Sequence, residues 1–113
     1  MKKYLVLNAD DFGMCKSANE AVFELFKSGD LLSATIMMPC PAAEEAVQFS
    51  IDNPQYAIGI HTTLTSEWKK YRWKPLTDGK SLLDPEGYMW PESDEVEKLS
   101  LIHISEPTRH AQI

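Results

Sequence analysis

Residues 3–29, KYLVLNADDFGMCKSANEAVFELFKSG, contain the first half of the pattern that decides the fold. The run Lys3–Leu7 is short and rich in large apolar residues, which predicts a buried strand. The polar stretch Asn8–Gly13 predicts a turn, and Ser17–Glu20 has the S-x-x-E spacing of a capping box at the start of a helix. Gly29 is placed to end that helix. The apolar residues of the helix recur with the period of one helix face: Ala18, Ala21, Val22, Leu25 and Phe26.

The same alternation continues up to residue 64. Ser33–Met38 predicts a second strand, Ala42–Phe49 a second helix, and Tyr56–Leu64 a third strand. The order β-α-β-α-β with short connections indicates parallel strands, and therefore an α/β sheet or barrel. Residues 65–90 lose the pattern, and a loop of this length predicts a lid or a substrate wall. Its large aromatic residues are interpreted either as sugar-stacking surfaces or as anchors of the loop: Trp68, Tyr71, Trp73, Tyr88 and Trp90.

The composition is that of one globular domain. Of the 113 residues, 43% are hydrophobic and 25% are charged, and the net charge of −6 argues against nucleic acid or an anionic membrane as a partner. Lys2 and Lys3 precede only a short apolar run, too short for the core of a signal peptide, which needs about 7–15 residues. Cys15 and Cys40 form no C-x-x-C pair. These features predict a cytoplasmic protein without a membrane span.

The last fifteen residues differ from the rest of the chain. Residues 99–109 read LSLIHISEPTR, which resembles, codon by codon, the translation of a transposon-derived sequencing-library adapter, followed by a sample index in residues 110–112. We therefore expect residues 1–98 to be the native part, cut from a longer gene, and residues 99–113 to be a non-native tail that packs poorly. The alternative is a short native strand, Leu101–Ile104, ended by Pro107.

Two carboxylates and one imidazole follow the ends of predicted strands. Asp10 and Asp11 come directly after the first strand, and His61 lies at the end of the third. Parallel α/β folds place their sites at the carboxyl ends of the strands, so we expect the two carboxylates and the imidazole to meet at one edge of the sheet. A divalent metal accepts carboxylate oxygen and imidazole nitrogen together, and an unligated Asp could act as a base on water. Two other interpretations stay open: the Asp pair as a turn whose charge favours a helix N-terminus, and His61 as an ordinary buried or edge histidine.

The two motifs together resemble one enzyme family. NADDFG at 8–13 and AIGIHTTLT at 57–65 are similar to motifs of the YdjC-like carbohydrate deacetylases, which include the chitooligosaccharide deacetylases, and the likeness runs from about Lys3 to about Glu97. The resemblance implies that the chain is the N-terminal β-α-β-α-β part of a truncated (β/α) barrel-like deacetylase fold. It also implies a divalent metal, usually magnesium with zinc as the alternative, and hydrolysis of the N-acetyl group of a short amino-sugar oligosaccharide.

The resemblance also assigns roles to three residues. His61 and Asp11 match metal ligands, and Asp10 matches the general base; the order within the Asp pair follows other metal-dependent deacetylases. With this assignment we expect the side chains of Asp11 and His61 to lie within about 5 Å of each other, as a shared metal requires. A second metal histidine and the general acid would lie outside this sequence. A complete barrel needs about 250 residues, so we expect the 113-residue chain to be unstable and inactive, and the function to belong to the full-length parent, with a homodimer as one expected assembly.

Two rival functions are compatible with the same residues. One is a different metal-dependent hydrolase on the same scaffold, acting on another acyl or sugar-phosphate substrate. The other is a non-catalytic, flavodoxin-like α/β module, in which the Asp pair and His61 are structural and the protein has no affinity for metal.

Overall fold

The computed structural model describes the backbone of residues 1–104 and the side chains of residues 1–99. The chain divides into two compact units, Met1–Thr63 and Leu64–Ile113, and each is described by itself. Among the described residues, no helix has both the length and the apolar character needed to cross a lipid bilayer.

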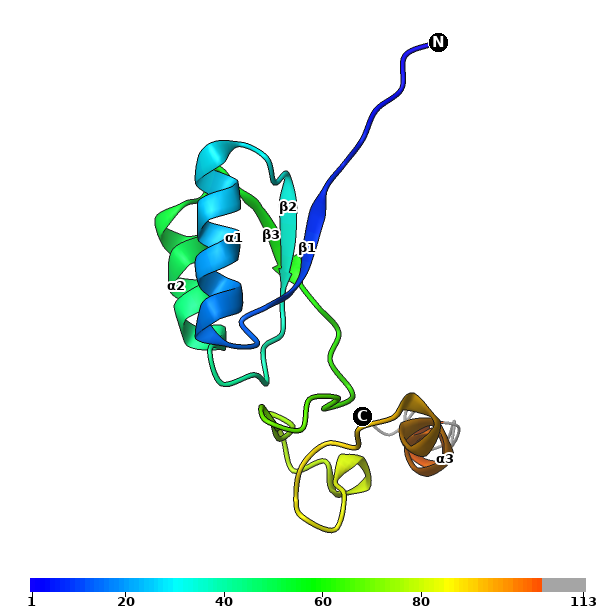
Figure 1. The fold of residues 1–113 in the computed structure, drawn as a ribbon. Helices are drawn as coiled ribbons and strands as arrows, with labels where there is room; N and C mark the ends of the chain where they lie inside the picture. The colour runs from blue at the N-terminus through cyan, green and yellow to red at the C-terminus, as the bar shows by residue number, and fades with distance from the viewer. Residues whose placement is uncertain (105–113) are drawn as a thin grey trace. The chain divides into compact units, whose positions relative to one another are not determined.

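The first unit is a parallel sheet with two helices. Its elements are, in chain order, β1 (Asn8–Phe12), α1 (Lys16–Ser28), β2 (Ser33–Ile36), α2 (Ala43–Asp52) and β3 (Ala57–Ile60). The strand order is β1-β2-β3, with both pairs parallel, and the two helices lie side by side on one face of the sheet (Figure 1). The predicted α/β class and the β-α-β-α-β order are therefore confirmed, with strand and helix ends that differ from the predicted ones.

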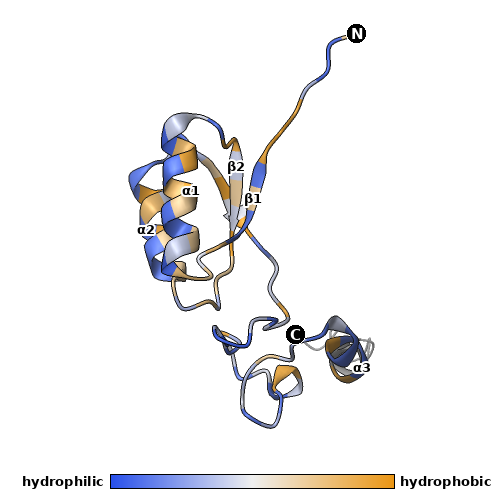
Figure 2. Ribbon diagram, viewed as in Figure 1, coloured by the Kyte–Doolittle hydropathy of each residue, from blue (hydrophilic) through white to orange (hydrophobic). Residues whose placement is uncertain are grey.

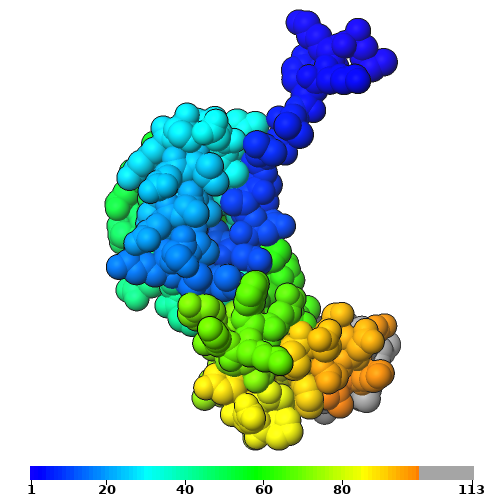
Figure 3. Space-filling view, viewed as in Figure 1, coloured from blue at the N-terminus to red at the C-terminus, as the bar shows by residue number. Residues whose placement is uncertain are grey.

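The first strand lies later in the sequence than predicted. β1 covers most of the stretch predicted to be a turn, whereas Tyr4, Leu5 and Val6 are 68–86% exposed and extend away from the body of this unit (Figure 3). The reason is pairing: β2 begins at Ser33, whose partner is Asn8, so the preceding residues have no neighbouring strand among the described residues. Apolar content alone does not make a strand without a partner to supply hydrogen bonds.

The two ends of α1 give one correction and one confirmation. The helix begins at Lys16 with Cys15 as N-cap, so Ser17 lies inside the first turn and the predicted capping box is wrong. Its C-terminus follows the prediction, because Gly29 adopts a left-handed conformation with φ 83° and donates its N–H to the carbonyl of Phe26. Glycine adopts this conformation without the steric cost that a Cβ would add.

The core lies between the helices and the sheet. Both helices carry a mixture of hydrophobic and hydrophilic residues (Figure 2), and their apolar residues meet the sheet in a cluster around Phe12, which is fully buried. Phe12 contacts Phe23 and Phe49 edge to face, while Phe49 stacks on Phe23 at a centroid distance of 4.3 Å. This aromatic packing fixes the position of β1 relative to the two helices.

The second unit has little regular structure. It contains a short 3₁₀ helix, η1 (Lys80–Leu82), and α3 (Ser93–Ile104), which crosses the predicted boundary at residue 98. The alternative strand at 101–104 is wrong, because that backbone is helical. The expected behaviour of residues 105–113 and of the side chain of His103 lies outside the described residues.

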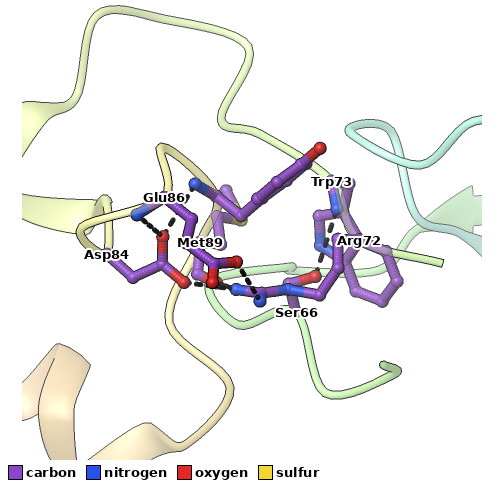
Figure 4. A network of polar contacts seen from close by, with 7 residues as sticks. Ser66, Arg72, Trp73, Asp84, Glu86 and Met89 are labelled. Atoms are coloured by element: carbon purple, nitrogen blue, oxygen red, sulfur yellow. Dashed lines mark hydrogen bonds and ion pairs between the residues drawn. The ribbon is translucent and has the colours of Figure 1, made fainter. Parts of the chain in front are cut away.

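Arginine and tryptophan side chains hold the irregular segment together (Figure 4). The Arg72 guanidinium donates hydrogen bonds to Asp84 and to the carbonyl of Met89. Trp73 is 3% exposed and is bonded at both of its nitrogens: its backbone N–H donates to the hydroxyl of Ser66, and its indole N–H donates to a backbone carbonyl at 2.8 Å. Of the two interpretations of the aromatic residues, Trp73 is thus an anchor of the loop.

Candidate active site

The two aspartates occupy a bulge in β1. Ala9 pairs with Ala34 and Phe12 with Ile36, so two residues of β1, Asp10 and Asp11, lie against a single residue of β2. Side chains alternate along a regular strand, so residues three apart would face opposite sides. Here Ala9 and Phe12 both pack toward the helices, and the extra residue allows both carboxylates to avoid the apolar core. Bulges re-aim side chains in this way beside functional sites.

The backbone at Asp11 is held in a sparsely populated conformation. Its φ is 60°, in the left-handed region, which costs about 1–2 kcal/mol for most residues and less for Asp. The next turn is tightly packed, because a Cβ at Gly13 would lie 3.0 Å from the Cα of Ala43. The Gly13 N–H donates to Oδ1 of Asn19 at 2.8 Å, and the Asn19 amide donates to the carbonyl of Ala42 and to Glu45. Asn19 is fully buried and ties the turn after Asp11 to the start of α2.

His61 reaches Asp11 across the end of β2. Nε2 of His61 lies 3.5 Å from Oδ1 of Asp11, and the two side chains are 34% and 48% exposed. The backbone N–H of His61 donates to the carbonyl of Ile36 at 2.9 Å, which extends the β2–β3 ladder by one residue. The hydroxyl of Thr63 donates to the His61 carbonyl. The expected proximity of Asp11 and His61 is therefore met, although β1 and β3 are not neighbours in the sheet.

Asp10 lies on the sheet face that the helices leave uncovered, and its Oδ1 atom accepts two hydrogen bonds. The Asn8 amide donates at 2.8 Å and the Thr35 hydroxyl at 3.2 Å. The carboxylate is exposed, so water and a small substrate reach it in this unit.

The donor set fits two ligands of one divalent cation. Metal bonds of about 2.0–2.2 Å place neighbouring ligand atoms about 3.0–3.4 Å apart, close to the separation between Asp11 and His61. Both side chains are open enough to admit an ion and its water. Within the part of the chain that the structure describes, no group of three or more His, Cys, Asp or Glu side chains is suited to hold a metal.

Burial raises the pKa of the nearby Cys40 thiol to about 12, and the negative charge of Asp11 adds to this effect, so Cys40 stays protonated near neutral pH.

Three residues that support the site were not predicted from the sequence. Asn8, Asn19 and Thr35 each bond to the aspartate bulge or to the turn that follows it. A buried hydrogen bond at Asn19 could have been predicted, because a polar residue on the apolar face of a helix is expected to find a buried partner. Nothing in the local sequence distinguishes Thr35 from any other strand residue.

Comparison with known protein families identifies the family of this chain. The family model of YdjC-like proteins matches residues 4–113. The chain belongs to the family of YdjC-like proteins. The range matched by the family model includes residues 99–113. The interpretation of these residues as a non-native tail stays a prediction.

Two proteins similar to this YdjC-like chain are named as deacetylases. The carbohydrate deacetylase of Geobacillus stearothermophilus is 40% identical over 87 residues, which are 77% of this chain and 33% of that protein. The chitooligosaccharide deacetylase of Yersinia enterocolitica is 36% identical over 110 residues, which are 94% of this chain and 41% of that protein.

A solved structure supports the same relation. A protein from Enterococcus faecalis V583, provisionally named a cellobiose-phosphate cleavage protein, superposes with a TM-score of 0.68 at 33% identity. The superposition covers 83% of this YdjC-like chain and 36% of that one. The chain thus spans between a third and about two fifths of the length of these relatives.

Proposed function

We propose that this chain supplies the first part of the active site of a metal-dependent carbohydrate deacetylase, which removes N-acetyl groups from amino-sugar oligosaccharides. The observation that supports this most directly is the pair formed by Asp11 and His61, 3.5 Å apart at the carboxyl ends of β1 and β3. A carboxylate oxygen and an imidazole nitrogen at this distance suit a divalent cation. The names of the relatives point to a sugar substrate bearing an acetyl group.

The three residues divide two tasks in this proposal. Asp11 and His61 hold the cation, and a bound divalent cation would polarise the acetyl carbonyl and make water more acidic. Asp10 is the general base. Asp10 is adjacent to Asp11 in the chain, and its carboxylate is exposed. It can therefore take a proton from a water molecule that attacks the carbonyl carbon of the acetyl group.

The test uses the complete natural protein that contains residues 1–98. His61→Ala is expected to abolish metal binding, measured by calorimetry with Mg²⁺ and with Zn²⁺, and to abolish acetate release from N-acetylated chitooligosaccharides. Asp10→Asn is expected to keep metal affinity and to lower kcat by about 100-fold or more, the usual contribution of a general base. Asp52→Asn makes the same chemical change at the exposed end of α2 and is the matched control.

Each outcome has a definite meaning. Acetate release that survives His61→Ala contradicts the metal role, and full turnover by Asp10→Asn contradicts the role of the base. A protein that binds neither cation and releases no acetate favours a non-catalytic module instead.

The relative from Enterococcus faecalis supports a second candidate, hydrolysis of a phosphorylated disaccharide, because its name refers to cleavage of cellobiose phosphate. Incubating the complete protein separately with cellobiose phosphate and with an N-acetylated chitooligosaccharide separates the two. Release of acetate supports the deacetylase, and release of a monosaccharide product from the phosphorylated disaccharide supports the second candidate.

A further inference from the structure

Four polar side chains form a continuous hydrogen-bonded row on the uncovered face of the sheet. The hydroxyl of Ser33 donates to Oδ1 of Asn8 at 2.6 Å. This bond fixes the orientation of the Asn8 amide, whose nitrogen then donates to Oδ1 of Asp10 at 2.8 Å. The hydroxyl of Thr35 donates to the same Asp10 oxygen at 3.2 Å. The bonds from Asn8 and Thr35 therefore meet on one atom of the carboxylate that the proposed function uses as the base.

The sheet register explains why Thr35 can reach Asp10. Thr35 pairs with Gly59 of β3 on one side and lies against the bulge of β1 on the other. A Cβ at Gly59 would lie 4.0 Å from the Thr35 methyl carbon, so the methyl group is on the side of β3 and the hydroxyl is on the side of β1. A threonine in a strand has a restricted χ1 angle, and this placement holds its hydroxyl toward the carboxylate.

Both donors contact the same oxygen of Asp10. Among the described side chains, Oδ1 accepts both hydrogen bonds and Oδ2 accepts none. Two bonds to one oxygen restrict rotation of the carboxylate and leave the other oxygen available as a proton acceptor.

We propose that Thr35 is a positioning residue, which together with Asn8 orients the Asp10 carboxylate so that Oδ2 faces the attacking water. This inference rests on the proposed function, because it assumes that Asp10 is the base. It adds a role for β2, the central strand, which contributes none of the three residues assigned to the site.

The experiment compares two variants of the complete natural protein. Thr35→Val keeps the shape of the side chain but removes the hydroxyl, and is expected to lower kcat about tenfold because the base is misaligned. KM and the affinity for the metal are expected to stay unchanged, because Thr35 contacts neither Asp11 nor His61 through any described hydrogen bond. Thr35→Ser keeps the hydroxyl and is expected to restore most of kcat. Ser50→Ala removes a hydroxyl from α2, which covers the opposite face of the sheet, and serves as the control.

A double-variant cycle separates this inference from the proposed function. If Thr35 acts through Asp10, then Thr35→Val causes no further loss of kcat in the Asp10→Asn background. Full activity of Thr35→Val, or equal losses in both backgrounds, overturns the positioning role. If Asp10→Asn itself keeps full turnover, the proposed role of Asp10 fails, and the positioning role fails with it.

Discussion

Replacing Asn19 by alanine tests the support of the site. Asn19 is fully buried between α1 and the start of α2 and makes three hydrogen bonds, to Gly13, Ala42 and Glu45. Asn19→Ala removes all three hydrogen bonds at once. It leaves the buried Gly13 N–H without a partner, while the Ala42 carbonyl keeps only the long bond of 3.4 Å from the Ala46 N–H. The hydrogen bond from the Ala42 N–H to the Gly13 carbonyl then remains to join the turn that follows Asp11 to the start of α2.

The expected loss follows mainly from the Gly13 N–H. A buried group left without a partner costs about 1–3 kcal/mol, so the free energy of unfolding is expected to fall by about 2 kcal/mol. For a protein of about 150–250 residues, each kcal/mol corresponds to about 2–4 °C, which gives a decrease in Tm of about 4–8 °C. Metal affinity is expected to weaken as well, because the turn restrains Asp11.

The assay is thermal unfolding of the complete natural protein, followed by circular dichroism, together with calorimetry for the metal. Gln48→Ala is the matched control, because it also deletes a side-chain amide, but from an exposed hydrogen bond on α2. It is expected to lower Tm by about 2 °C or less, since surface interactions contribute little. If Asn19→Ala and Gln48→Ala give the same Tm, the argument from the buried network is refuted.

Two further predictions concern titrating groups. A hydrogen bond from Ser17 lowers the pKa of Cys15, whereas burial raises the pKa of Cys40 to about 12. An alkylating reagent at pH 8 is therefore expected to modify Cys15 first. Peptide mass spectrometry measures the two rates, and faster modification of Cys40 contradicts the prediction. The hydrogen bond from Arg72 lowers the pKa of Asp84 below its ordinary 3.8, so the ion pair stabilises the segment 64–98 above that pH and loses its effect as the pH falls through the lowered value. Asp84→Asn is therefore expected to lower the free energy of unfolding at pH 7, and the difference in this free energy between variant and wild type is expected to narrow below about pH 3.8. Unfolding monitored by tryptophan fluorescence measures this, and a difference that does not depend on pH contradicts the prediction.

The local periodicities were sufficient to predict the order of elements. The apolar face of α1 and the stop at Gly29 are local properties, and the structure confirms both. The ends of the elements were less predictable, because the start of β1 depends on where β2 begins to pair with it. The predicted capping box is wrong because the helix begins earlier, with Cys15 as its N-cap, so Ser17 lies inside the first turn.

By itself, the sequence determined that parallel strands would bring Asp11 and His61 to one edge of a sheet, because strand direction and alternation with helices follow from local patterns. Only the tertiary structure decided how the two aspartates are presented. The bulge exists because Phe12 packs into the aromatic core while Ala9 stays paired with Ala34, and the extra residue must be absorbed between them. The support from Asn19 and Thr35 is equally non-local, since their partners lie 6–26 positions away in the chain. Contacts of this kind depend on the register between strands and on side-chain packing, which no local pattern of residues specifies.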